Sequence, residues 1–320
     1  MPLEADNLIN MNKARCLIIF CLILLVACHS DRKPSLKIGL FDISKNDGNI
    51  LFSFSKNGTI SIASVNLDGK GLKVIVRSTV DSNYYNPTFS PDGSKMLFLG
   101  SKRNNEDGCS MFLARSDGTQ KREILRDRGE IIEAVFSGCE EKIYYIKSKE
   151  FGHSSPLGRS QPHNSDVYSL SLVDGSTQQI THKAAYSMYR LSEFKCDKIL
   201  LSMSNGIEKG LQMFAKDKPE QITEINPVNN PRKDNSFYNT PFYSQKYNML
   251  AFIAPYELYI MSMNNRIARL VIYDDDMVKY FRFYNNQEKI VYTNEHRLSF
   301  YIVDFKGAKV SEIDIGSAFD

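Results

Sequence analysis

Tryptophan is absent from the 320 residues, and the charges nearly balance, with 40 Lys and Arg against 37 Asp and Glu. No basic run with interleaved aromatic residues occurs, although such a run marks many nucleic-acid-binding surfaces. No Gly-x-Ser-x-Gly motif occurs either, and that motif carries the nucleophile of α/β-hydrolases. The sequence therefore predicts no nucleic-acid partner and no hydrolysis of this serine type.

Long apolar runs are scarce, because only residues 17–27 form one, and it is shorter than the ~20 residues that a transmembrane helix needs. Two basic residues precede this run, and an alanine followed by Cys28 ends it. This order is typical of a secretory signal peptide. We predict a signal peptide over residues 1–27. Met11 is an alternative start, because two acidic residues precede it.

A repeated pattern accounts for most of the remaining chain. Its clearest copy is Asn-Pro-Thr-Phe-Ser-Pro-Asp-Gly-Ser-Lys-Met-Leu-Phe-Leu at residues 86–99, followed by Asp117-Gly118. Weaker copies begin near residues 40, 135, 190, 241 and 281. Alternating apolar residues around Asp-Gly turns indicate strands, and a period of about 40 to 57 residues is typical of a propeller. The sequence predicts an all-β, six-bladed β-propeller of four-stranded antiparallel blades over residues 36–320.

The repeat resembles the TolB-type propeller repeat, whose features are a Ser-Pro-Asp-Gly turn and a later strand that ends in Asp-Gly. The resemblance covers roughly residues 36–315 and weakens in the last three copies. It implies a propeller of the bacterial envelope.

The segment Leu-Val-Ala-Cys28 resembles a bacterial lipobox, in which the cysteine is acylated and becomes the mature N-terminus. The resemblance implies a lipoprotein anchored to the membrane through Cys28, because several buried acyl chains hold a protein at a bilayer. Residues 28–35 would form a polar tether. The histidine after Cys28 favours the outer membrane.

We name the strands of each blade a to d, from the channel outward. The a–b and c–d turns then share one face of the disc, and the longer b–c and d–a loops, such as residues 147–165 and 224–239, share the other. Variable loops on a rigid scaffold are where binding usually occurs, so we expect the b–c/d–a face to bind a protein, peptide or glycan. The residues expected at the channel mouth on this face are Tyr84, Tyr85, Asn86, Arg128, Glu130, Tyr186, Met188, Tyr189, Phe237, Tyr238, Asn239, Asp276 and Lys279.

Two further interpretations concern histidine and cysteine. His153, His163 and His182 fall on the same face and are weak candidates for metal ligands, so a metal-dependent carbohydrate-active enzyme resembling oligogalacturonate lyase is the alternative function. The leading interpretation is non-catalytic and requires no cofactor. Cys139 and Cys196 lie at equivalent a–b turns of neighbouring repeats, and the sequence leaves open whether they form a disulfide or stay free.

Overall fold

The computed structural model describes residues 36–102, 108–153, 160–204, 209–233 and 238–319. The predicted signal peptide, the tether, the predicted lipidation site Cys28 and the expected mouth residue Phe237 lie outside the described residues. No helix among the described residues is both long enough and apolar enough to cross a membrane.

The described residues form six four-stranded antiparallel sheets. Blades 1 and 2 comprise β1 (Lys37–Ile43), β2 (Asn49–Lys56), β3 (Thr59–Asn66) and β4 (Lys73–Val76), then β5 (Ser82–Phe89), β6 (Lys95–Lys102), β7 (Cys109–Arg115) and β8 (Arg122–Asp127). Blades 3 and 4 comprise β9 (Glu130–Phe136), β10 (Lys142–His153), β11 (Ser160–Ser171) and β12 (Thr177–Gln179), then β13 (Ser187–Phe194), β14 (Lys198–Ser204), β15 (Lys209–Ala215) and β16 (Lys218–Glu224). Blades 5 and 6 comprise β17 (Asn239–Ser244), β18 (Met249–Ala254), β19 (Glu257–Ser262) and β20 (Ala268–Tyr273), then β21 (Val278–Phe283), β22 (Lys289–Asn294), β23 (Ser299–Asp304) and β24 (Lys309–Asp314), before the 3₁₀ helix η2 (Gly316–Ala318).

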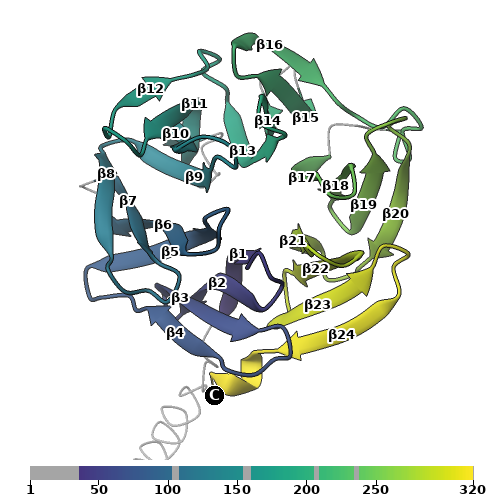
Figure 1. Ribbon diagram of the computed structural model, residues 1–320, viewed down its shortest axis with the longest axis horizontal. Coiled ribbons are helices and arrows are strands. Elements are labelled where there is room, and N and C mark those ends of the chain that lie inside the picture. Colours follow the sequence, from purple (N-terminus) through teal and green to yellow (C-terminus); the bar gives the residue numbers. More distant parts are fainter. Residues whose placement is uncertain (1–35, 103–107, 154–159, 205–208, 234–237, 320) are drawn as a thin grey trace, which may run out of the picture. The chain divides into compact units, whose positions relative to one another are not determined.

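Each sheet is built from four consecutive strands, and the first strand of each lies nearest the central axis (Figure 1). This arrangement confirms the predicted six-bladed propeller. Blade 1 and blade 6 each hold four strands of their own, so the ring closes without strand exchange between them. Closure depends on side chains instead, with Phe41 packed against Phe300 and Asp42 paired with Arg282.

The turn chemistry explains why the repeat folds locally. In the Ser-Pro-Asp-Gly turn between β5 and β6, the Asp92 carboxylate accepts hydrogen bonds from Ser90 Oγ and from the backbone N–H and hydroxyl of Ser94. Gly93 has a φ of 77°, a left-handed conformation that glycine adopts at little cost. The motif is therefore a self-contained turn that reverses the chain between strands a and b.

Strand a of every blade contains a register shift against strand b, the sign of a β-bulge. In blades 2, 4 and 5 the bulge holds a non-glycine residue at positive φ, namely Asn86, Arg190 and Thr240. A bulge changes the direction in which the next side chains point. The innermost strands can therefore aim polar side chains at the channel while apolar ones stay between the blades.

The apolar core lies between the blades. Six clusters of buried side chains occur, and each joins residues of two neighbouring blades. Each blade thus buries its faces only against its neighbours, which explains why a single repeat could not fold alone.

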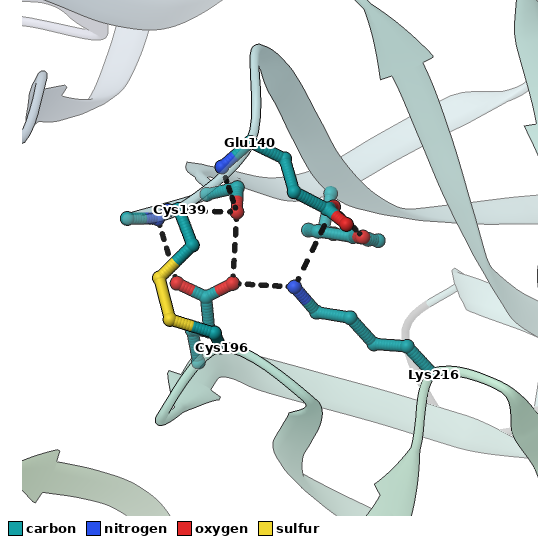
Figure 2. Close-up of a disulfide and its surroundings, with 8 residues drawn as sticks. Cys139, Glu140, Cys196 and Lys216 are labelled. Carbon is teal, nitrogen blue, oxygen red and sulfur yellow. Dashed lines mark hydrogen bonds and ion pairs between the residues drawn. A yellow bond between two sulfur atoms is a disulfide. The ribbon is translucent and has the colours of Figure 1, made fainter.

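The seam between blades 3 and 4 carries a covalent link. Cys139 and Cys196 form a disulfide with their Cα atoms 5.6 Å apart (Figure 2). Beside it, Glu193 accepts hydrogen bonds from Ser137 Oγ at 2.8 Å and from Lys216 Nζ at 2.6 Å. Of the two alternatives that the sequence left open, the structure therefore contains the disulfide.

One loop prediction was wrong. Residues 147–165 are not a continuous loop, because β10 and β11 pair as far as His153 and Ser160. The paired strands extend beyond the apolar core of the blade, so this part of the hairpin lacks the apolar alternation by which strands are recognised in a sequence.

Candidate binding cleft

A cleft of about 230 Å³ opens on the b–c/d–a face, between blades 2 and 3. Three of the residues expected at the channel mouth line it, namely Tyr85, Arg128 and Glu130. Tyr85 lies inside strand β5, and Glu130 begins strand β9. The two walls of the cleft therefore come from adjacent blades, so the framework of the propeller fixes the distance between them.

Glu130 is the least satisfied charged group of this cleft. Its side chain makes no hydrogen bond or ion pair with any other described residue, and burial raises the pKa of its carboxyl group above the ordinary value. Arg128, on the same short turn, is exposed and likewise has no described partner. By contrast, Asp127 nearby is paired with Lys147 at 2.7 Å. The cleft thus presents one carboxylate and one guanidinium without internal partners.

A thiol lies at the inner end of the cleft. Cys109 is 2% exposed, and its Sγ lies 3.3 Å from the hydroxyl oxygen of Tyr85. Burial raises the pKa of the Cys109 thiol, and burial also raises the pKa of the Tyr85 hydroxyl. Both groups are therefore neutral at physiological pH. This thiol acts as a packing group and not as an activated nucleophile.

A second cavity, of about 270 Å³, lies beside the first on the channel side, and Tyr85 lines both. It brings together Asn86 and Lys279, as expected for the channel mouth, with Tyr280. The ring of Tyr280 also carries the guanidinium of Arg190 at 4.8 Å, contributed by blade 4. The mouth is therefore polar and charged, with aromatic rings between the charges.

The other expected mouth residues are spread around the ring. Tyr84 and Tyr238 are buried, with 7% and 1% exposure, and pack between blades instead of facing solvent. Tyr84 faces blade 1 and Tyr85 faces blade 3, because neighbouring residues of a strand point to opposite faces. Tyr186 is exposed, Tyr189 is half-buried in β13, and Asn239 begins β17.

The three histidines do not form a described cluster. His163 stacks on Tyr186, with ring centroids 4.4 Å apart, and its Nδ1 lies 3.1 Å from the Tyr186 carbonyl oxygen. His182 is exposed, and the side chain of His153 lies outside the described residues. Among the residues that the structure describes, no group of three His, Cys, Asp or Glu side chains could hold a metal ion.

Sequence reasoning missed Lys149, Glu150 and Cys109 as lining residues of the cleft. The first two lie on the hairpin extension, where the sequence predicts a loop. Residues 148–153 show no apolar alternation, so no sequence signal marks the extension.

No protein-family model matches the chain, and no curated protein matches it in sequence. Several solved structures share its fold. TolB from Acinetobacter baumannii has a TM-score of 0.64 at 15% identity, and the match covers 85% of this chain and 66% of that one. Hydrazine synthase from Kuenenia stuttgartiensis has a TM-score of 0.65 at 14% identity, covering 86% and 45%. Oligogalacturonate lyase from Vibrio parahaemolyticus has a TM-score of 0.55 at 10% identity, covering 88% and 85%. At these identities the likeness concerns the fold alone, so the described chain is a TolB-like six-bladed β-propeller.

Proposed function

We propose that this protein is a non-catalytic binding protein of the bacterial envelope, and that the cleft between blades 2 and 3 takes a segment of a partner protein. The observation that carries the proposal is the Glu130 carboxyl group, which is partly buried and has no described partner. A charge removed from water without a partner costs free energy. A cation supplied by a ligand would offset that cost.

The charges of the cleft favour a peptide as the ligand, rather than a glycan or the surface of a folded protein. Glu130 suits an ammonium or guanidinium group, and Arg128 suits a carboxylate. The volume of about 230 Å³ lies below the ~300–1,000 Å³ of most small-molecule sites. The cleft therefore suits one or two side chains of an extended segment, and not a whole free ligand.

The test is panning of a displayed random-peptide library against the full-length protein. We expect enrichment of peptides that contain Lys or Arg. Glu130→Gln should weaken their binding about tenfold, because it removes one charge-assisted contact. Glu220→Gln is the matched control, since Glu220 is an exposed carboxylate on the distant strand β16 and should leave binding unchanged. Enriched peptides that bind Glu130→Gln as tightly as the unmodified protein would contradict the proposal.

Anchoring in the envelope is a separate part of the proposal and is supported by residues 1–28 of the sequence. We propose that Cys28 is acylated and holds the propeller at a membrane, most simply the outer membrane. Cys28→Ala with the signal peptide removed should move the protein from the membrane fraction to the soluble fraction of its host. Processed protein that stays in the membrane fraction would refute this.

The alternative is a metal-dependent carbohydrate-active enzyme, supported by the shared fold with oligogalacturonate lyase. His163 and His182 would supply imidazole ligands, and Glu130 would supply a carboxyl group whose pKa is raised by burial. Elemental analysis of the protein purified from its host distinguishes the two functions. A transition metal at one equivalent that is lost in His163→Ala would favour the enzyme, and a metal-free protein that binds peptides would favour the binding role.

A further inference from the structure

A further cavity lies on the face opposite the candidate binding cleft. It is an open cleft of about 780 Å³ between the a–b and c–d turns of blades 1 and 2. We call it the seam cleft. Its volume falls within the ~300–1,000 Å³ of sites that hold whole small ligands. The sequence predicted no site here.

Two contacts frame the seam cleft and keep it from closing. Toward the channel, the backbone N–H of Phe89 donates to Asp42 Oδ2 at 2.9 Å and joins the two blades. Toward the rim, Gly118 lies against Ile75 so closely that a Cβ atom would come within 2.7 Å of the Ile75 carbonyl oxygen. The blades touch at both ends, and the space between them is therefore a fixed feature of the fold.

Several polar side chains line the seam cleft with their hydrogen-bonding groups unused. The ammonium groups of Lys45 and Lys73, the amides of Asn49 and Asn66 and the hydroxyl of Ser64 make no side-chain hydrogen bond or ion pair with other described residues. Ser64 is 9% exposed, so its hydroxyl lies deep in the cleft. These groups combine donors and acceptors, because amides and hydroxyls serve as both.

The charges of the seam cleft cancel. Asp92 and Asp117 line the cleft together with the two lysines. Hydrogen bonds from Ser90 and from Thr119, respectively, hold the pKa values of these carboxyl groups below their ordinary value. Both carboxylates are therefore ionised at neutral pH. A site with balanced charge does not select an anion or a cation. It favours a neutral ligand that both donates and accepts hydrogen bonds.

Apolar surface is limited to Ile75 and Phe89, which also pack on the core between blades 1 and 2. This is too little for the apolar side chains of a protein partner, yet it suits the C–H face of a sugar ring. We propose that the seam cleft binds a neutral oligosaccharide, whose hydroxyls are bonded by Asn49, Asn66 and Lys73. This site is independent of the peptide cleft on the other face.

The test is an array of defined oligosaccharides probed with the full-length protein, followed by titration of the binding compounds. We expect neutral oligosaccharides among them. Asn49→Ala and Lys73→Met should each weaken binding about tenfold through loss of one or two hydrogen bonds. Lys70→Met is the matched control for Lys73→Met. Lys70 is exposed on the c–d turn that precedes Lys73, but it does not line the cleft. The Lys70→Met variant should bind as the unmodified protein does.

Three outcomes would overturn the inference. An array without binding above background would exclude an oligosaccharide, and binding restricted to acidic saccharides would show that the lysines dominate over the carboxylates. Loss of saccharide binding in Glu130→Gln, with Asn49→Ala unaffected, would place the saccharide in the candidate binding cleft instead. Failure of peptide binding alone would leave this inference intact, since the two clefts share no residue.

Discussion

Two seams of the propeller can be compared on the face that carries the a–b turns. They are the seam between blades 1 and 2 and the seam between blades 3 and 4, and they differ in the bonds that join their turns. At the second seam a disulfide joins the a–b turns (Figure 2). Beside it, Glu193 accepts hydrogen bonds from Lys216 Nζ, from Ser137 Oγ and from the backbone N–H of Gly138. At the first seam the corresponding turns are separated by the 780 Å³ seam cleft.

This difference shows how a repeat fold separates cohesion from binding. At the cross-linked seam the polar side chains of Glu193 and Lys216 bond each other. Blades 1 and 2, whose turns are separated by the seam cleft, leave Lys45, Lys73, Asn49 and Asn66 available. The apolar core between the blades is present at both seams, so the fold survives either arrangement.

The largest effect is expected from removing the disulfide. It closes a loop of 57 residues between blades 3 and 4, and constraint of the unfolded chain by such a loop is worth about 2–4 kcal/mol. Cys139→Ala with Cys196→Ala should lower the free energy of unfolding by that amount in urea titrations. Dithiothreitol should lower the stability of the unmodified protein equally and leave the double variant unchanged. Equal stability of the unmodified protein and the double variant, each with and without dithiothreitol, would contradict this expectation.

A smaller loss is expected from Glu193→Gln. The Glu193 carboxylate accepts charge-assisted hydrogen bonds from Lys216 Nζ, from Ser137 Oγ and from the backbone N–H of Gly138. Loss of a charge-assisted bond at a largely buried site costs about 1.5–3 kcal/mol. Urea titration with Glu220→Gln as the exposed control measures it. A loss no greater than that of the control would mean that the disulfide alone holds this seam.

The fold could be predicted because the turns of the repeat depend on residues that are close together in the sequence. Asp92 and Gly93 define their turn within six residues, so each blade is visible in the sequence. The sites could not be predicted to the same extent, because they depend on distances between blades. Tyr84 and Tyr85 are neighbouring residues of the same type, but Tyr84 is buried and Tyr85 lines two cavities. The difference arises because successive side chains of a strand point to opposite faces of the sheet. The seam cleft depends on the distance between the turns of blade 1 and those of blade 2, and no residue pattern in the sequence predicts that distance.

The seam between blades 2 and 3 extends the comparison, because it buries a charge without a described partner. Burial raises the pKa of Glu130 in the folded state, so the folded protein binds that proton more tightly than the unfolded chain. The contribution is most favourable below the unfolded pKa of ~4.3 and is lost as pH rises through the raised pKa. Glu130→Gln should therefore match the unmodified protein near pH 4 and be more stable at pH 7, by ~0.5–1 kcal/mol after screening by solvent. Greater stability of the variant at pH 4 than at pH 7, relative to the unmodified protein, would reverse the sign and refute the argument.

The smallest effect is expected at the open seam itself, from Lys45→Met combined with Lys73→Met. Neither ammonium group has a described hydrogen bond or ion pair, and both side chains are exposed. Substitutions of this kind usually change stability by less than ~0.5 kcal/mol, so the double variant should unfold at the same urea concentration as the unmodified protein. The same pair of changes should nevertheless weaken saccharide binding at the seam cleft at least about tenfold, because it includes Lys73→Met. A loss of stability similar to that of Glu193→Gln would mean that these lysines hold blades 1 and 2 together, and the contrast between a bonded seam and a binding seam would fail.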